Sequence, residues 1–233
     1  MKIIAISDLH GSLVPIEESA DILIIAGDIS PLEIQSNKPE VLNWLKTEFK
    51  EWIDNLPVEK VFLVAGNHDF IFESIAQGKL LELLRLWKYK VVYLKNSLAS
   101  YLDSEGKEWT IFGTPYCHTF GNWPFMRSDE YMEEKFKEIP EEVDIIISHD
   151  PPFEVGFHDC VLQRYNSIVG PQHIGNEPLR KQLENTKFKW LFCGHIHSGD
   201  HDPSEFNGGN VVNVSIKNEY YEPIYNPFII EIL

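Results

Sequence analysis

The stretch Ile3-Ile4-Ala5-Ile6-Ser7-Asp8-Leu9-His10 decides how the chain is interpreted, because an apolar run ends directly in an aspartate and a histidine. Four consecutive apolar residues, three of them β-branched, are typical of a buried strand. Similar runs follow at residues 22–25 and 61–64. A helical pattern separates these two runs, and alternation of strand and helix predicts parallel strands with helices outside the sheet.

The predicted helix covers residues 37–56, with Asn37 as its N-cap, Pro39 in its first turn and Pro57 after its end. Further helices are predicted over residues 128–139, with Ser128 as N-cap, and around residues 179–183. The other predicted strands cover residues 91–94, 98–102, 109–112, 143–147, 190–192, 211–214 and 228–232. No repeat or linker interrupts the pattern, so we expect one domain over residues 1–233.

The charge, cysteine content and hydropathy of the chain limit the kinds of protein that it can be. The chain has 233 residues and a formal net charge of -16, which disfavours generic nucleic-acid binding but not a small phosphorylated substrate. Its three cysteines lack the spacing of a disulfide framework or zinc knuckle, and free thiols in a reducing cytoplasm are expected. No stretch approaches the roughly 20 apolar residues that span a bilayer. A cytoplasmic protein without a membrane segment is predicted, and the sequence predicts no oligomeric state.

Five of the predicted strands end in groups of metal-capable residues. Because the carboxyl ends of parallel strands share one edge of a sheet, these groups are expected to converge on one site. Their agreement carries the argument, since a lone D-x-H or H-x-H pattern is common by chance. The groups are Ser7-Asp8-Leu9-His10, Gly27-Asp28, Gly66-Asn67-His68-Asp69, Ser148-His149-Asp150 and Gly194-His195-Ile196-His197.

The residue types in these groups suit two divalent cations. Carboxylate, amide and imidazole ligands without thiolate favour manganese, with iron, zinc or magnesium as alternatives, over a calcium cage. The candidate ligands are Asp8, His10, Asp28, Asn67, His149, His195 and His197. Asp28 is the expected bridging carboxylate. Two ions roughly 3.5–4 Å apart can share a water and lower its pKa. His68 is the candidate proton donor to a leaving oxygen, with Asp69 as a possible orienting partner.

In this order, D-x-H, G-D, G-N-H-D, a later histidine and G-H-I-H resemble the calcineurin-like metallophosphoesterases. The resemblance spans Asp8 to His197 and implies a four-layer α/β/β/α sandwich of two mixed sheets flanked by helices. It also implies that one metal takes Asp8, His10, Asp28 and His197. The other metal would take Asp28, Asn67, His149 and His195.

Three further segments are similar to the small MPPED-type branch, whose members resemble class III cyclic-nucleotide phosphodiesterases. The segments are Ser148-His149-Asp150-Pro151-Pro152, Gly113-Thr114-Pro115-Tyr116 and Asn213-Val214-Ser215. The G-D-x-V-D-R-G signature of protein phosphatases is missing after Gly27-Asp28. The favoured function is hydrolysis of a small phosphodiester, such as a cyclic nucleotide, by a hydroxide that bridges two metal ions. The alternatives are a phosphomonoesterase or nuclease on the same core, and a non-catalytic protein-binding scaffold.

Two loops, at residues 114–127 and 150–175, are long enough to be binding walls or lids. In the first, four residues are candidates for stacking a base and reaching a phosphate: His118, Trp123, Phe125 and Arg127. The alternative is that these residues pack over a small core. In the second loop, His158 and Asp159 are weaker catalytic candidates. His173 and His201 are expected to be ordinary surface residues.

Overall fold

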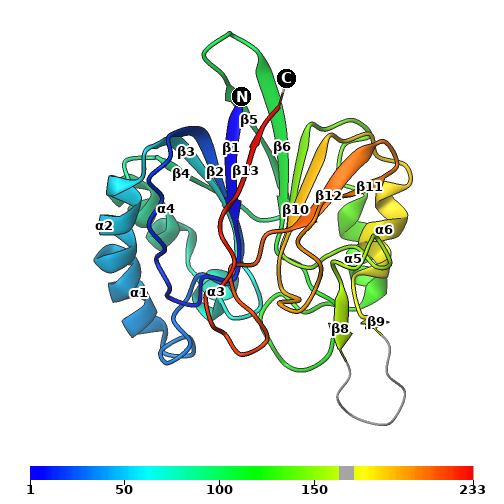
Figure 1. Cartoon of the computed structure of the whole chain (residues 1–233). Helices are drawn as coiled ribbons and strands as arrows, with labels where there is room; N and C mark the ends of the chain where they lie inside the picture. Colours follow the sequence, from blue (N-terminus) through cyan, green and yellow to red (C-terminus); the bar gives the residue numbers. More distant parts are fainter. Residues whose placement is uncertain (163–170, 233) are drawn as a thin grey trace.

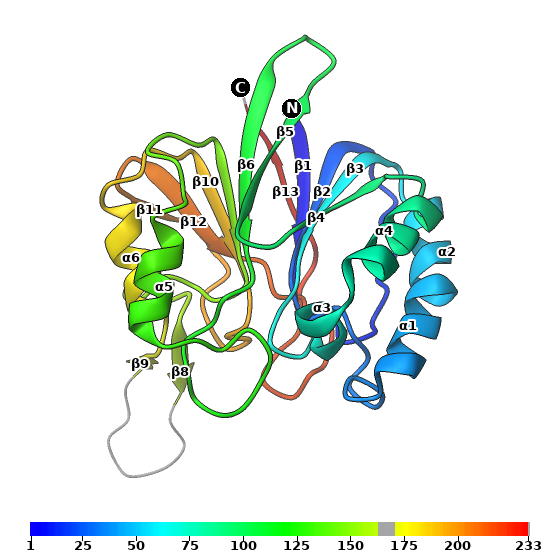
Figure 2. The same cartoon turned by 180° about the vertical axis from the view of Figure 1, so that it is seen from behind.

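Two β-sheets pack face to face, with helices on both outer faces, in the computed structural model, which describes residues 1–162 and 171–232 (Figures 1 and 2). The predicted four-layer α/β/β/α sandwich is confirmed. The first sheet has the order β13 (Phe228–Glu231), β1 (Lys2–Ile6), β2 (Ala20–Ala26), β3 (Val58–Val64) and β4 (Val91–Leu94). The second has the order β11 (Ser204–Phe206), β12 (Gly209–Asn213), β10 (Trp190–Cys193), β7 (Ile145–Ser148), β6 (Glu108–Thr114) and β5 (Ser97–Leu102).

Each sheet has a parallel centre; the first has one antiparallel edge strand and the second has two. Strands β1 to β4 pair in parallel, and β13 pairs antiparallel with β1. Strands β6, β7, β10 and β12 are also parallel, and β5 and β11 close the two edges antiparallel. The parallel strands are apolar on both faces because one face meets the other sheet and the other face meets helices. In β1, Ile3 and Ala5 pack between the sheets, while Ile4 and Ile6 pack against the helical layer.

The helices are divided between the two outer faces (Figure 1). Helices α1 (Lys38–Lys46), α2 (Glu48–Asn55) and α4 (Gln77–Leu86) cover the first sheet, and the short α3 (Phe70–Ser74) lies near its lower end. Helices α5 (Asp129–Phe136) and α6 (Glu177–Leu183) cover the second sheet. Ser128 caps α5 as predicted, by accepting a hydrogen bond from the Tyr131 N–H.

Two helix predictions were wrong in detail. The single helix expected over residues 37–56 is broken at Thr47, whose side chain donates a 2.9 Å hydrogen bond to the Asn43 carbonyl. The apolar stripe continues across the break, which is why periodicity alone did not reveal it. Asn37 occupies the N-cap position, but its side chain contacts Glu40 instead of accepting a backbone hydrogen bond.

The loop expected over residues 150–175 contains an unpredicted antiparallel hairpin, β8 (Cys160–Leu162) and β9 (Pro171–His173). Residues 163–170 of that loop lie outside the described residues, so the predicted role of the loop as a lid stays a prediction. No helix in the described ranges combines the length and apolar character needed to cross a membrane.

Candidate metal centre

The five groups of metal-capable residues converge where the two sheets meet. Strands β1, β2 and β3 are neighbours in the first sheet, and β7 and β10 are neighbours in the second. The prediction of one shared sheet edge is therefore corrected: the site lies between two edges, brought together by face-to-face packing. The backbone N–H of His195, after β10, donates to Asp8, after β1, at 3.0 Å from Oδ2. This hydrogen bond joins the two sheets within the site.

Several of the candidate ligands have left-handed backbone conformations. The φ angles are 57° at Asp8, 42° at His10, 53° at Asp28 and 67° at His195. Non-glycine residues seldom adopt this region, and such strain concentrates at functional sites. The turns direct these side chains back across the strand ends and towards one another.

Asp8, His10 and His197 form the first part of the site, with potential ligand atoms within 4.8 Å of one another. His197 Nδ1 donates to the Asn218 carbonyl at 3.0 Å, and its Nε2 faces Asp8 Oδ1 at 3.3 Å. Both ring nitrogens of His10 are buried without a hydrogen-bond partner among the described residues. A buried imidazole without partners is costly in a protein interior, and a bound cation would satisfy it.

Asp28, Asn67 and His149 form the second part. His149 Nδ1 donates to the Ala26 carbonyl at 2.8 Å, so its Nε2 faces the site. That nitrogen lies 3.0 Å from Asn67 Oδ1 and 3.3 Å from Asp28 Oδ2. If His149 were neutral, its Nε2, Asn67 Oδ1 and Asp28 Oδ2 would be three adjacent acceptors with no hydrogen between them. Either a proton or a metal ion must therefore lie among them.

Glycines at the strand ends make room for this arrangement. A Cβ on Gly66 would collide with Asp28 Oδ1 and the His149 ring, and a Cβ on Gly194 would collide with Asp8 Oδ2. The backbone therefore approaches the carboxylates more closely than other residue types allow. Buried anions, a partnerless imidazole and converging acceptors all fit a pair of divalent cations.

Electrostatic interactions within this cluster are strong. Burial alone would raise the pKa of Asp28, but the adjacent His149 outweighs it and holds the pKa well below the usual value. Burial would lower the pKa of His149, but Asp28 outweighs this and raises it to about 10. For His10 and His195 burial prevails and lowers each pKa to about 4. These two histidines are therefore neutral and ready to donate a lone pair.

His68 lies beside the cluster and is half-buried. Its backbone N–H donates to Asp28 Oδ1 at 2.7 Å, and its Nδ1 donates to Gln35 Oε1 at 2.5 Å. The expectation that Asp69 orients His68 was wrong. Asp69 is buried and accepts hydrogen bonds from the Gly66 N–H and from the Ser30 N–H and hydroxyl, so it fixes the loops instead.

A family model described as calcineurin-like phosphoesterase matches residues 1–199 of the chain. The chain belongs to this family. It is therefore a metal-dependent phosphoesterase, and the resemblance predicted from its motifs is confirmed.

Several proteins are similar to this phosphoesterase. Metallophosphoesterase domain-containing protein 1 of Homo sapiens is 28% identical over 246 residues, which cover 99% of this chain and 71% of that protein. A UPF0046 protein of Caenorhabditis elegans is 28% identical over 203 residues, or 84% of this chain and 63% of that protein. The phosphopantetheinyl hydrolase of Mycobacterium tuberculosis aligns with a TM-score of 0.51 at 15% identity, covering 94% of this chain and 90% of that structure. The structural likeness supports the fold alone.

The phosphoesterase has a cavity of about 600 Å³ above the candidate metal centre. Asp28, Asn67, His68, His195 and His197 line its floor. The predicted substrate residues His118 and Trp123 lie on its wall, and the Trp123 and His68 rings are 4.7 Å apart. Sequence reasoning missed the other wall residues, which are Phe120, Val161, Ile174, Ile196, Ser198, Glu219 and Tyr221.

Phe125 and Arg127 do not line this cavity, so the expectation for them was wrong. Phe125 is fully buried in the core, and its N–H donates to Glu73. Arg127 makes a 2.9 Å ion pair with Glu73. The alternative of simple packing therefore holds for these two members of the loop.

Tyr221 was missed because no pattern near it indicates a site. Its ring centroid lies 5.0 Å from that of His10 and 5.0 Å from that of His197. The segment after β12 returns across the strand ends and places this ring there. Only the three-dimensional path of the chain brings Tyr221 to the cavity.

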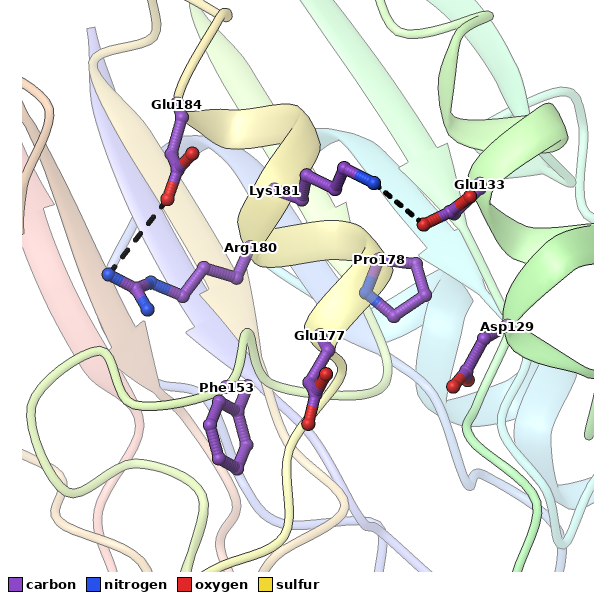
Figure 3. Close-up of a pocket in the computed structure, with 8 residues that line it drawn as sticks. All are labelled: Asp129, Glu133, Phe153, Glu177, Pro178, Arg180, Lys181 and Glu184. Atoms are coloured by element: carbon purple, nitrogen blue, oxygen red, sulfur yellow. Dashed lines mark hydrogen bonds and ion pairs between the residues drawn. The ribbon is translucent and has the colours of Figure 1, made fainter.

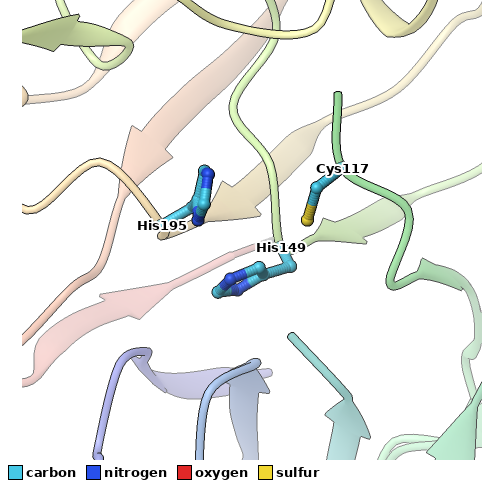
Figure 4. Close-up of side chains that lie close together, drawn as sticks. All are labelled: Cys117, His149 and His195. Atoms are coloured by element: carbon cyan, nitrogen blue, oxygen red, sulfur yellow. The ribbon is translucent and has the colours of Figure 1, made fainter. Parts of the chain in front are cut away.

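Cys117 lies next to His149 and His195 (Figure 4). The ligands predicted from the sequence include no thiolate, so this neighbour was not anticipated. The three potential ligand atoms are within 4.8 Å of one another. Complete burial raises the pKa of the Cys117 thiol well above its ordinary value. Its Sγ donates to the Pro115 carbonyl at 3.5 Å. It is a neutral thiol packed beside the two histidines.

A second hollow, of about 360 Å³, lies between α5 and α6 (Figure 3). Its charged side chains are partly paired: Lys181 contacts Glu133 at 2.9 Å, and Arg180 contacts Glu184 at 4.0 Å. Such exposed pairs contribute little energy and indicate a solvated surface. The candidate metal ligands and His68 all lie elsewhere, at the strand ends.

The remaining histidines differ from expectation. His158 is buried, and its Nδ1 donates to the Asp200 carbonyl at 2.7 Å. His201 is half-buried and stacks on Tyr225 with ring centroids 3.8 Å apart, so it is not an ordinary surface residue. His173 contacts Asp159 and Cys160, outside the metal centre.

Proposed function

We propose that this phosphoesterase hydrolyses a small phosphodiester with two divalent metal ions, manganese being favoured. The observation that carries the proposal is the chemistry of the cavity. Its wall is mainly aromatic and aliphatic, and none of the described residues that line it is a lysine or arginine. A monoester brings nearly two negative charges and a diester only one. A wall without cations suits the less charged ester.

The ligands divide between the two ions as the family resemblance implies. Asp8, His10, Asp28 and His197 would hold one ion, and Asp28, Asn67, His149 and His195 would hold the other. When bound, the ions would neutralise phosphate charge and lower the pKa of a water so that it becomes a nucleophile. Asp28 would be a ligand of both ions in this proposal. Its position supports that role, because it lies 3.3 Å from His149 Nε2 and 3.8 Å from His10 Nε2.

The side chains around the ions position the ester and move the proton. With Nδ1 engaged by Gln35, the other ring nitrogen of His68 is left for the substrate. His68 would protonate the leaving oxygen, which is the step that a poor leaving group most needs. Asn67 and His118 would bind the remaining phosphate oxygens.

The organic part of the substrate would lie against Trp123, Phe120 and Tyr221. Aromatic rings stack on nucleobases without requiring a specific sequence, and the cavity volume is in the range of small-molecule sites. A cyclic nucleotide is the substrate we favour. We also propose that residues 1–233 form one domain and that the protein is cytoplasmic, which its three free cysteines support.

The proposal is tested with bis-p-nitrophenyl phosphate and p-nitrophenyl phosphate, on metal-stripped protein with and without added Mn²⁺. Preferential cleavage of the diester that returns with Mn²⁺ is expected, and a panel of cyclic nucleotides would follow. Preferential cleavage of the monoester would replace the proposal with a phosphomonoesterase. Failure to cleave either ester in protein shown to bind metal would instead favour a very selective enzyme or the non-catalytic scaffold.

A further inference from the structure

The β8–β9 hairpin carries a second group of metal-capable side chains, separate from the strand-end centre. Cys160 and His173 are directly opposite each other in the hairpin register. Cys160 Sγ lies 3.4 Å from His173 Nδ1, and that nitrogen lies 2.7 Å from Asp159 Oδ1. A sulfur, a nitrogen and an oxygen therefore surround one point. We propose that these three side chains bind a zinc ion, as a third metal site.

The distances are close to those that zinc requires. Bonds of about 2.3 Å to sulfur and 2.0–2.1 Å to nitrogen or oxygen place tetrahedral ligands roughly 3.3–3.8 Å apart. The separation of Cys160 Sγ and His173 Nδ1, 3.4 Å, already lies in this range. The separation of His173 Nδ1 and Asp159 Oδ1 is shorter, at 2.7 Å, because a hydrogen bond joins them. Metal binding would widen that contact by about half an ångström.

Two of the three ligands are held in place before any metal arrives. Asp159 is buried, and its Oδ2 accepts hydrogen bonds from the Gly175 N–H at 3.0 Å and the Glu154 N–H at 3.2 Å. This leaves Oδ1 for the metal, with the backbone fixing the carboxylate from behind. The His173 ring stacks with Phe157 at a centroid distance of 5.8 Å. The site therefore needs little rearrangement to bind an ion.

The protons and charges balance. Binding would displace one proton from the Cys160 thiol to solvent. The His173 ring would move its proton from Nδ1 to Nε2, so that Nδ1 can bind the metal and the ring releases no proton. Thiolate and carboxylate together neutralise the charge of Zn²⁺. Because sulfur is a soft ligand, this site should prefer zinc or cobalt to manganese, in contrast to the nitrogen and oxygen ligands at the strand ends.

The site adjoins the wall of the main cavity. Val161 follows Cys160 in sequence and Ile174 follows His173, and both line the cavity above the strand-end centre. An ion that joins the two strands of the hairpin would therefore fix that part of the wall. Three protein ligands also match the number at zinc sites that retain a position for water.

The experiment uses Co²⁺ bound to the metal-stripped full chain, because cobalt–thiolate bonds give an intense near-ultraviolet charge-transfer band. The variants are Cys160→Ser and His173→Gln, and Cys117→Ser is the control for the buried thiol beside the strand-end centre. We expect the band in wild type and Cys117→Ser and its loss in Cys160→Ser. Wild type should also bind one more Co²⁺ per chain than Cys160→Ser, and excess Zn²⁺ should abolish the band.

The proposal is overturned if wild type shows no thiolate band, if the band persists in Cys160→Ser, or if both bind the same number of ions. A band that disappears only in Cys117→Ser would place the sulfur ligand at the strand-end centre and also exclude the proposal. Circular dichroism checks that each variant folds. His173→Gln should weaken Co²⁺ binding at this site by at least about tenfold, which provides a second test if Cys160→Ser is unstable. None of these outcomes depends on which ester the enzyme cleaves.

Discussion

His118 donates two hydrogen bonds to one carboxylate oxygen of Asp150, from its backbone N–H at 2.9 Å and from its ring Nδ1 at 2.8 Å. Asp150 is buried and directly follows His149, whereas His118 lines the cavity. The pair thus connects the cavity wall to the strand end that carries a metal-ligand candidate. The buried carboxylate orients the ring and leaves its Nε2 for the substrate.

Replacing His118 should therefore weaken substrate binding more than it slows the chemical step. We expect His118→Ala to raise KM for bis-p-nitrophenyl phosphate by about tenfold, the effect of losing roughly 1.5 kcal/mol from a charge-assisted hydrogen bond. The change in kcat should be much smaller. Steady-state kinetics at saturating Mn²⁺ separates the two constants. A loss confined to kcat would assign His118 to the chemical step instead of to binding.

Asp28→Asn should abolish most activity without unfolding the chain. The substitution keeps the shape of the side chain but removes the charge that would lie between both ions. We expect turnover to fall by more than about a hundredfold. This exceeds the usual loss when a residue that only hydrogen-bonds to a metal ligand is replaced. Metal content by elemental analysis should fall as well, while circular dichroism stays unchanged. Wild-type rates in a folded Asp28→Asn variant would exclude the proposed metal centre.

The role proposed for His68 predicts a dependence on the leaving group. His68→Gln should cost roughly 10²–10⁴-fold with an alkyl leaving group, which needs a proton, and far less with p-nitrophenolate. The measurement compares kcat/KM for methyl p-nitrophenyl phosphate with that for an alkyl diester such as a cyclic nucleotide. Gln35→Leu is the matched variant, since it removes only the contact at Nδ1. An equal loss for both esters would point to phosphate binding and against proton donation.

The sequence was sufficient to predict which side chains gather at the candidate site because each of them follows a strand. A buried apolar run such as residues 3–6 has a defined end, and the side chains after it must lie at the sheet edge. What the pattern could not show is that two sheets contribute. Whether β3 and β7 share a sheet depends on long-range pairing, which leaves no trace in local periodicity.

The cavity wall was less predictable for a related reason. Phe125 and Trp123 are two residues apart in one loop, yet Phe125 packs in the core and Trp123 faces the cavity. Aromatic side chains suit both environments, so residue type does not distinguish them. Tyr221 lies far along the sequence from Trp123 and reaches the site only through the path of the chain. Tertiary packing decides these positions.

The contact between His149 and Asp28 predicts how the metal-free protein responds to pH. Burial disfavours the charged ring, but the carboxylate outweighs it and raises the pKa of His149 from 6.5 to about 10. Because the folded pKa lies above the unfolded value, the stabilisation is fully present below pH 6.5 and is lost as pH rises towards 10. The Tm of metal-stripped protein should therefore fall over this interval, and the fall should be smaller in His149→Gln.

The same proton competes with the metal for His149 Nε2. For each proton that the metal must displace, Mn²⁺ affinity should fall by about tenfold for every pH unit below the pKa of His149. Titration calorimetry in buffers of different ionisation enthalpy would count the protons released on binding. Release of at least one proton near neutral pH, together with a rising affinity up to about pH 10, is expected. Binding without proton release would show that His149 is already neutral, and that the converging acceptors of the metal-free site do not share a proton.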